Sequence, residues 1–262
     1  MPTYETLDWS LSDGVATITL NRPRAGNALT MQMGQELMDA SIRCDDNPEV
    51  RAVVLTGAGK MFCVGADLKQ FPPAGPKMAA EIKLLTTWLH AAISRFVRMD
   101  APLICAINGT AAGAGMSLAL IGDMALVAES ARFKMAYSRL ALTPDCAATY
   151  YLPRLVGFRR AFELYVTNRV LSATEAEAWG LVNQVVPNDA LLSEAQALAV
   201  QLASGPMQAI GATKRLFHSA WTESLESQMA QETRTITNAA RSPEAAEGFE
   251  AFFEKREPNF NR

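Results

Sequence analysis

The chain has 262 residues, enough to bury a large core as one domain or as one domain with a small extension. Hydrophobic residues make up 49% of it and charged residues 19%, which is an ordinary globular composition. The net charge of −3 and the lack of any run of five like charges argue against a nucleic-acid-binding protein and against a protein held on an anionic membrane.

Residues 1–5 contain no basic segment followed by an apolar one, so we predict no secretory signal, and no apolar stretch is long enough to span a bilayer. The four cysteines, Cys44, Cys63, Cys105 and Cys146, lie far apart, and the chain has two histidines. This pattern favours reduced thiols over a zinc site. We therefore expect a cytoplasmic protein without a bound metal.

The first half of the chain alternates between strand and helix patterns. A hairpin is predicted over residues 6–20, with Asp13-Gly14 at its turn, and Thr30 is the predicted cap of the helix that follows. The later elements expected here are a buried strand over 51–56, a loop over 65–75, a helix over 76–98, a strand over 103–107, a helix over 111–120 and a strand over 124–128. This β-β-α-β-α-β-α-β order predicts an α/β fold with parallel crossovers.

The second half has helical periodicity throughout. The helices predicted there lie over 159–167, 173–179, 191–202, 206–220, 223–239 and 243–253. The break at Val186-Pro187-Asn188 is the boundary we expect between a core of residues 1–187 and a C-terminal helical subdomain of residues 188–262.

Two glycine-containing turns each follow a predicted buried strand, one over residues 57–68 and one over residues 108–116. Neither has the spacing of a nucleotide-binding phosphate loop. The second turn enters a helix, whose first N–H groups are free and favour negative charge. Two such turns could present two N–H groups to one oxygen, although for either turn alone a tight turn or close helix packing is the better explanation.

Together the two turns resemble the enoyl-CoA hydratase/isomerase (crotonase) family. They read G-x-x-F-C-x-G-A-D-L over 59–68 and A-x-N-G-x-A-x-G-x-G over 106–115, and the tail resembles F-x-E-K-R-x-P-x-F over 252–260. The resemblance covers essentially the whole chain in order. It implies a core of stacked ββα turns, a C-terminal helical trimerisation region, assembly as a homotrimer or a dimer of trimers, and an acyl-CoA thioester substrate with no cofactor beyond the coenzyme A of that substrate.

The same resemblance implies where the substrate lies. The thioester oxygen would be held by the backbone N–H groups of Ala66 and Ala114. The residues expected to bind coenzyme A or substrate are Val64, Gly65, Asp67, Leu68, Lys69, Gly113, Trp88, Arg24, Phe252 and Lys255. For Arg24 and Lys255, a solvated surface charge is an equally good interpretation.

The catalytic acids of the family's hydratases are absent. Where those enzymes carry two glutamates, this chain has Ser117 and Tyr137, so water addition would lack both its base and its acid. Asp145, after Leu142-Thr143-Pro144, stands where two other branches of the family place their working carboxylate. On residue type alone, Asp145 could equally cap a helix that begins near Ala147.

One of these branches resembles ring-epoxyphenylacetyl-CoA isomerase and implies that Asp145 moves a proton along the acyl chain. The other is the 4-chlorobenzoyl-CoA dehalogenase branch, in which the carboxylate is a nucleophile and a histidine, here His90, activates water. Tyr137 is then a pocket wall or a proton donor, and His90 is catalytic or simply a hydrogen-bonded histidine between helix and sheet. We rank isomerase first, dehalogenase-like chemistry second and hydratase third, with a non-catalytic acyl-CoA-binding or RNA-binding scaffold as the alternative outside catalysis.

Overall fold

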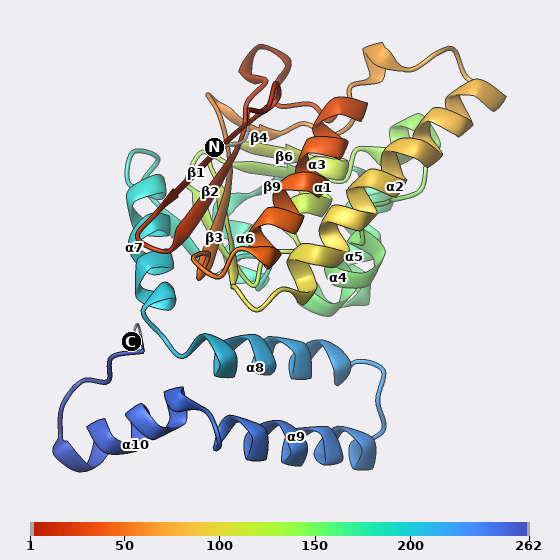
Figure 1. Cartoon of the computed structure of the whole chain (residues 1–262). Helices are drawn as coiled ribbons and strands as arrows, with labels where there is room; N and C mark the ends of the chain where they lie inside the picture. The colour runs from red at the N-terminus through yellow and green to blue at the C-terminus, as the bar shows by residue number, and fades with distance from the viewer. Residues whose placement is uncertain (1–2, 261–262) are drawn as a thin grey trace.

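Two sheets lie at the centre of the computed structural model, which describes residues 3–260 (Figure 1). Across these residues the larger sheet has six strands in the order β1-β2-β3-β5-β7-β10, and all neighbours are parallel except the β1–β2 pair. Its strands are β1 Leu7–Ser12, β2 Val15–Leu20, β3 Ala52–Gly57, β5 Leu103–Ile107, β7 Met124–Ala128 and β10 Gln184–Val186. The hairpin and the three strands predicted after it are confirmed.

The central strands β3 and β5 of the larger sheet are buried at every position, so the sheet is covered on both faces there. In β3, Val53 and Leu55 belong to the core that contains α1 (Met31–Asp46), whereas the alternate residues Ala52 and Val54 pack on the opposite face. That second face is covered by α7 (Leu191–Ala203). Alternate side chains of a strand point to opposite faces, so a continuous apolar run is what a sheet covered on both sides requires.

A smaller sheet lies across the carboxyl ends of these strands and was not predicted. Its order is β4-β6-β8-β9, and its strands are β4 Met61–Cys63, β6 Thr110–Ala112, β8 Arg132–Lys134 and β9 Leu171–Ser172. The helix predicted over 111–120 is therefore wrong at its start. Ala111 and Ala112 belong to strand β6 and pair with Phe133 and Lys134 of β8. The helix α3 covers only Ala114–Ala119. Strands of two or three residues leave no periodic pattern to detect.

The helices otherwise follow the predicted order. They are α1, α2 (Pro76–Arg98), α3, α4 (Ala148–Val156), α5 (Phe158–Thr167), α6 (Ala173–Ala178), α7, α8 (Met207–Ser219), α9 (Leu225–Ala239) and α10 (Pro243–Glu254). Thr30 caps α1 as predicted, because its hydroxyl accepts the N–H of Met33 at 3.1 Å. The α1 and α2 helices lie side by side against the sheets (Figure 1).

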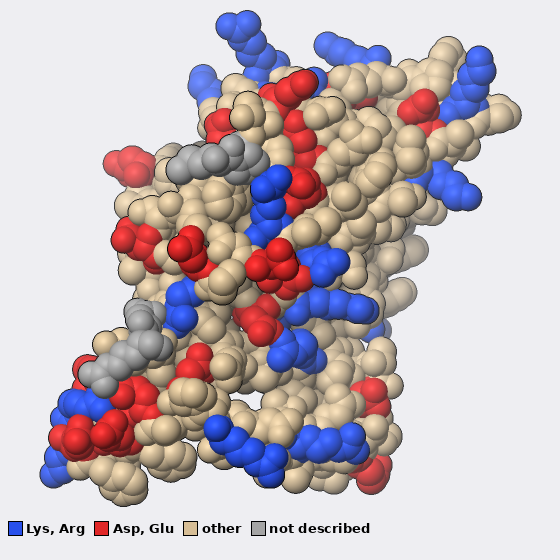
Figure 2. All heavy atoms as spheres, viewed as in Figure 1, with Lys and Arg blue, Asp and Glu red and all other residues tan. Residues whose placement is uncertain are grey.

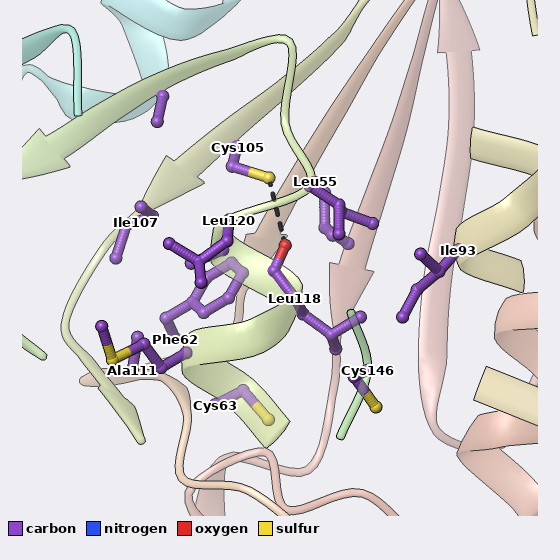
Figure 3. Packing of buried hydrophobic residues seen from close by; sticks show 14 of the residues in the cluster. Leu55, Phe62, Cys63, Ile93, Cys105, Ile107, Ala111, Leu118, Leu120 and Cys146 are labelled. Atoms are coloured by element: carbon purple, nitrogen blue, oxygen red, sulfur yellow. Dashed lines mark hydrogen bonds between the residues drawn. The ribbon is translucent and has the colours of Figure 1, made fainter. Parts of the chain in front are cut away.

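The short helix α3 is enclosed by core side chains on every side (Figure 3). Leu118 and Leu120 pack among Leu55, Phe62 and Ile93, and the Cys105 thiol donates to the Leu118 carbonyl oxygen at 3.6 Å. All six residues of α3 are buried. Because protein interiors are close-packed, the amino terminus of α3 is held in a fixed position.

The helices α8, α9 and α10 form an arm that extends away from the sheets (Figure 1). Lys214 of α8 ties the arm to the core through Asp123, and α7 packs on the large sheet. The subdomain boundary at residue 188 and the trimerisation role of this region stay predictions. On the face shown in Figure 2, acidic and basic side chains are interspersed. Among the described residues, no helix is long and apolar enough to cross a membrane.

Candidate active site

The two glycine-containing turns predicted from the sequence meet at one edge of the smaller sheet. β4 and β6 are parallel neighbours, so the turns that follow them leave the sheet on the same side. Glycine is required where they touch. A Cβ built on Gly115 would lie 2.1 Å from the Cys63 carbonyl oxygen, and one built on Gly65, whose φ is +98°, would lie 3.0 Å from the Ala112 oxygen and 3.5 Å from the Ala114 nitrogen.

Each turn leaves one backbone N–H group without an acceptor in the described part of the chain. The two neighbours of Ala66 are hydrogen-bonded to Leu29. The N–H of Asp67 donates to the Leu29 carbonyl oxygen and the N–H of Leu29 donates to the Gly65 carbonyl oxygen, both at 2.8 Å, and the Ala66 N–H takes part in neither bond. Ala114 is the first residue of α3, where an N–H has no partner within the helix. Both residues line the same cavity, so the arrangement can present two N–H donors to one ligand oxygen.

This cavity, called the turn cavity below, has a volume of about 370 Å³ and is mostly apolar. Besides the two turns, it is lined by Phe71, Met78, Ile82, Leu85, Thr86, Ala136, Tyr137, Leu140, Leu142, Thr143 and Asp145. Asp145 is the only residue of this lining with a carboxylate or a basic group. The cavity therefore suits an apolar group attached to a polar head that the N–H groups hold.

The helix-cap interpretation of Asp145 is wrong. The N-cap residue of α4 is Ala147, and no side chain caps that helix. Cys146 and Ala147 both have positive φ, +51° and +62°, an uncommon backbone for residues with a Cβ. This strained segment turns the Asp145 side chain away from the helix and toward the turn cavity, and strain of this kind concentrates at functional sites.

The groups that contact the Asp145 carboxylate are uncharged. Tyr137 Oη donates to Oδ1 at 2.5 Å, and no cation pairs with Asp145 among residues 3–260. Burial, and then the nearby carboxylate, raise the pKa of Tyr137 far above its ordinary value, so the phenol keeps its proton. The same two causes raise the pKa of the Cys146 thiol. Tyr137 is thus a hydrogen-bond donor to Asp145 as well as part of the cavity wall.

Ser117 and Tyr137, which occupy the positions of the hydratase glutamates, contact each other. Their hydroxyl oxygens lie 3.0 Å apart, and Ser117 Oγ is 3.3 Å from the Gly113 carbonyl oxygen. Ser117 is fully buried. These two positions therefore supply hydroxyl groups and no second acid beside Asp145.

His90 lies on the other side of Asp145. Its Nε2 accepts the N–H of Cys146 at 3.1 Å, so this nitrogen carries no proton in that bond. His90 lines a second cavity of about 860 Å³, called the helix cavity below, between α2, α4 and α8, and Asp145 borders both cavities. The predicted pair of His90 and Asp145 is thus adjacent, but His90 does not line the turn cavity.

Several other predicted residues lie at the rim of the turn cavity. Val64 and Leu68 line it and are exposed, whereas Lys69 and Arg24 are exposed on the turns 68–70 and 23–25 and are not part of its lining. Asp67 is instead engaged within the chain, since its carboxylate pairs with Arg22 at 2.9 Å. Their roles toward coenzyme A stay predictions.

Three predicted residues are not brought to the turn cavity within one chain. Trp88 lies against Gly34 of α1, at which an added Cβ would be 3.3 Å from the Trp88 Cβ. Phe252 and Lys255 lie at the end of α10 on the arm, where Phe252 borders a cavity of about 460 Å³ next to α8 (Figure 1). The roles of these three residues toward the substrate stay predictions.

The sequence reasoning missed the apolar wall from α2 and the Arg22 contact. Met78, Ile82 and Leu85 recur at helical spacing, which is also the pattern of a face that packs on the core. Arg22 carries no signal of its own, because its partner Asp67 is 45 residues away. Within residues 3–260, no group of three or more acidic, histidine or cysteine side chains is arranged to hold a metal ion.

Comparison with known proteins gives consistent matches over almost the whole chain. The family model described as Enoyl-CoA hydratase/isomerase matches residues 10–262. The 1,2-epoxyphenylacetyl-CoA isomerase of Escherichia coli (strain K12) is 40% identical over 250 residues, which cover 94% of this chain and 95% of that protein. The 4-chlorobenzoyl coenzyme A dehalogenase-2 of Arthrobacter sp is 36% identical over 246 residues, which cover 93% of this chain and 89% of that protein.

A solved structure has the same arrangement of sheets and helices. The crystal structure of an enoyl-CoA hydratase from Mycobacterium smegmatis matches with a TM-score of 0.91 at 35% identity, covering 98% of this chain and 100% of that chain. The α/β fold predicted from the sequence, with its core of stacked ββα turns, is confirmed. Isomerase, dehalogenase and hydratase all occur among these relatives, so similarity alone does not choose the reaction.

Proposed function

Because the chain belongs to the enoyl-CoA hydratase/isomerase family, we propose that it is an isomerase that moves the double bond of an enoyl-CoA thioester, with Asp145 as its single base. The observation that carries this proposal is the composition of the turn cavity. It holds two unpaired N–H groups and one carboxylate, and its remaining lining is mostly apolar.

The N–H groups of Ala66 and Ala114 bind the thioester oxygen in this proposal. Donors placed where negative charge develops are typically worth a few kcal/mol each in lowering the barrier. The coenzyme A moiety runs along residues 64–69, with Arg24 near its phosphates. Phe252 and Lys255 of a second copy complete the binding surface if the chains assemble as the family resemblance implies.

Asp145 then moves one proton. It takes the proton from the carbon beside the thioester of a 3-enoyl-CoA, and the electron pair of that C–H bond is delocalised onto the thioester oxygen. The two N–H groups hold the resulting dienolate. The same carboxyl returns the proton to the far end of the former double bond, which gives the 2-enoyl-CoA. One base suffices because the proton is moved and not consumed.

Hydration is poorly supported because it needs a base for water and an acid for carbon. The positions that carry these groups in hydratases hold Ser117 and Tyr137, and Tyr137 keeps its proton. A serine hydroxyl and a phenol of raised pKa are weak bases at neutral pH.

Dehalogenase-like chemistry is the second candidate, and the position of His90 beside Asp145 on the helix cavity favours it. In that reaction Asp145 attacks an aryl ring, displaces halide, and the resulting ester is hydrolysed by water that His90 activates. Against it, the Nε2 of His90 is already engaged by Cys146, and His90 lines the helix cavity instead of the turn cavity.

The test is a turnover screen of aliphatic 3-enoyl-, 2-enoyl- and halobenzoyl-CoA thioesters with wild type and Asp145→Asn. We expect 3-enoyl-CoA to be converted to 2-enoyl-CoA, and Asp145→Asn to reduce the rate by about 10²- to 10⁴-fold, the usual contribution of a general base. Asp189→Asn, an exposed aspartate outside both cavities, is the matched control.

Two results would contradict the isomerase proposal. One is an undiminished rate in Asp145→Asn. The other is halide release from halobenzoyl-CoA with oxygen-18 from water incorporated into Asp145 in a single turnover, which would favour the second candidate instead.

A further inference from the structure

A continuous line of hydrogen-bonding groups runs from Asp145 to the second turn. Tyr137 Oη donates to Asp145 Oδ1 at 2.5 Å and lies 3.0 Å from Ser117 Oγ. Ser117 Oγ lies 3.3 Å from the carbonyl oxygen of Gly113. Since Ser117 is fully buried, no solvent interrupts the line at this point.

The number of hydrogens limits how this line can be arranged. Each hydroxyl has one hydrogen and can donate once. Tyr137 donates to the ionised carboxylate, because a charged acceptor forms the stronger bond. Ser117 then has one hydrogen for two acceptors, Tyr137 Oη at 3.0 Å and the Gly113 carbonyl oxygen at 3.3 Å, and we expect it to favour the shorter contact in this state.

The arrangement changes when Asp145 becomes neutral. A neutral carboxyl group accepts more weakly than a carboxylate, so the hydrogen of Tyr137 is free to turn to Ser117 Oγ. The hydrogen of Ser117 then turns to the carbonyl oxygen of Gly113. No heavy atom has to move, because both contacts are already within hydrogen-bond distance.

The Gly113 carbonyl and the Ala114 N–H belong to the same peptide group. Resonance links the two ends of a peptide, so a hydrogen bond to its oxygen draws electron density from its nitrogen. The N–H becomes a stronger donor, which is the cooperative effect seen in chains of hydrogen bonds. A hydrogen bond from Ser117 to Gly113 therefore strengthens the donor that faces the turn cavity.

We propose that Ser117 is a positioning residue that couples the protonation of Asp145 to the donor strength of the Ala114 N–H, by switching its hydroxyl hydrogen between Tyr137 and Gly113. This inference rests on the proposed function of Asp145 as the base. The step that makes Asp145 neutral also places negative charge on the thioester oxygen. The switch thus strengthens the Ala114 donor when that charge is present, and it reverses when Asp145 returns the proton.

A serine that bonds the carbonyl four residues earlier is also a common local feature of helices. In that purely structural role, Ser117 would not respond to the charge of Asp145. A measurement of how Ser117 and Asp145 depend on each other therefore separates the two roles.

Infrared difference spectroscopy of bound 2-enoyl-CoA, with carbon-13 at the thioester carbonyl, provides that measurement. Asp145→Asn mimics the neutral carboxyl and is expected to shift the carbonyl stretch to lower wavenumber. The shift is expected to be smaller in the Ser117→Ala background, in which only the direct loss of the Asp145 charge remains. Tyr137→Phe alone should also lower the wavenumber, because Ser117 then donates to Gly113 permanently, whereas Ser117→Ala alone should stay near wild type.

An equal Asp145→Asn shift in both backgrounds would overturn the coupling, as would a Tyr137→Phe shift of zero or to higher wavenumber. If Ser117→Ala does not fold, the Tyr137→Phe spectrum still tests the switch, because this variant removes the Tyr137 acceptor and leaves Ser117 to donate to Gly113.

Kinetics supply a second readout. Ser117→Ala is expected to lower kcat by about three- to tenfold, the size of one hydrogen bond, with little change in KM. The matched control is Ser41→Ala, because Ser41 is fully buried in α1 and donates to the Met38 carbonyl oxygen at 2.7 Å. This control is expected to leave kcat unchanged.

The two proposals fail in different ways. If wild type moves the double bond of no 3-enoyl-CoA, the proposed function fails, and the spectra of bound 2-enoyl-CoA still report on the switch. If wild type isomerises and Asp145→Asn does not, but its spectral shift is the same with and without Ser117, the coupling alone fails.

Discussion

Two aspartates of this protein have opposite surroundings. Asp123 pairs with the buried ammonium of Lys214 at 2.6 Å and also accepts the N–H of Leu103 at 2.7 Å. The Lys214 ammonium further donates to the carbonyl oxygens of Phe96 and Ala101, so its three hydrogens are all used. Asp145 borders two cavities, and among the described residues it meets no cation.

The difference distinguishes a carboxylate that stabilises the fold, Asp123, from the carboxylate for which we propose a catalytic role, Asp145. Around Asp123 the charges are compensated and every ammonium hydrogen is bound, which fixes α8 and its arm to the core. Around Asp145 the negative charge is stabilised only by neutral donors, and the carboxylate faces space that a substrate can enter. A carboxylate of this second kind is able to take up a proton.

The largest expected effect is on activity at Asp145. Asp145→Asn should abolish most turnover while the free energy of unfolding stays within about 1 kcal/mol of wild type, because the substitution breaks no ion pair among the described residues and the amide has nearly the volume of the carboxylate. Urea unfolding followed by circular dichroism, beside the turnover assay, checks both values. A loss of several kcal/mol would place Asp145 in the structural class with Asp123.

Lys214→Met is expected to have the reverse effect. It leaves the charge of Asp123 without its partner, and breaking a buried ion pair in this way costs about 3–5 kcal/mol. Turnover per folded molecule should change little, because Lys214 borders neither the turn cavity nor the helix cavity. Lys77→Met, at an exposed position of α2, is the control. A Lys214→Met variant that is as stable as wild type but inactive would contradict the structural role given to Asp123 and Lys214.

Alkaline pH should affect the two clusters with opposite sign. The pKa of Tyr137 is raised in the folded protein, so its contribution to stability is complete below the unfolded pKa of about 10 and is lost as the pH rises further. Burial lowers the pKa of Lys214 despite Asp123, so the folded protein binds its proton less tightly than the unfolded chain. That contribution is complete above the unfolded lysine pKa of about 10.4 and is lost as the pH falls through the folded pKa.

Between pH 8 and pH 11, Tyr137→Phe is therefore expected to lose less stability than wild type, and Lys214→Met to lose more. Each fully shifted group contributes a slope of about 1.4 kcal/mol per pH unit. Urea unfolding at several pH values measures these slopes, and parallel curves for all three proteins would refute the assignment.

The smallest effect is expected at His90. If Asp145 acts as a base alone, His90→Ala removes only the hydrogen bond to the Cys146 N–H, and isomerase kcat should stay within about fivefold of wild type. In the dehalogenase alternative, the same substitution would stop hydrolysis and leave an aryl ester on Asp145, which mass spectrometry of the intact protein detects. The His90→Ala variant thus distinguishes the isomerase reaction from the dehalogenase reaction.

Much of the fold could be predicted because it is encoded locally. The buried strands at residues 51–56, 103–107 and 124–128 and the helix at 76–98 have unbroken patterns, and the structure follows them closely. The smaller sheet could not be predicted, since its strands have two or three residues and are stabilised only by pairing with distant segments. For the same reason the helix expected from Ala111 begins at Ala114.

The site divides in the same way. Ala66, Ala114, Asp145 and Tyr137 were predicted, because each lies in or beside a short motif, and the structure brings all four to one cavity. His90 was predicted too but lines the opposite side of Asp145. Phe252 and Lys255 were predicted by resemblance and lie on the arm, which a single chain does not bring to the turn cavity.

By itself the sequence determined the family and the α/β core and predicted Asp145 as the working carboxylate, because these depend on residue type and local order. Only the tertiary structure decided that Asp145 is not a helix cap and that Tyr137 donates to it. It also placed Ser117 between Tyr137 and Gly113. The contacts of Tyr137 with Asp145 and with Ser117 join residues 8 and 20 positions apart, and no local pattern fixes such distances until the sheets bring the segments together.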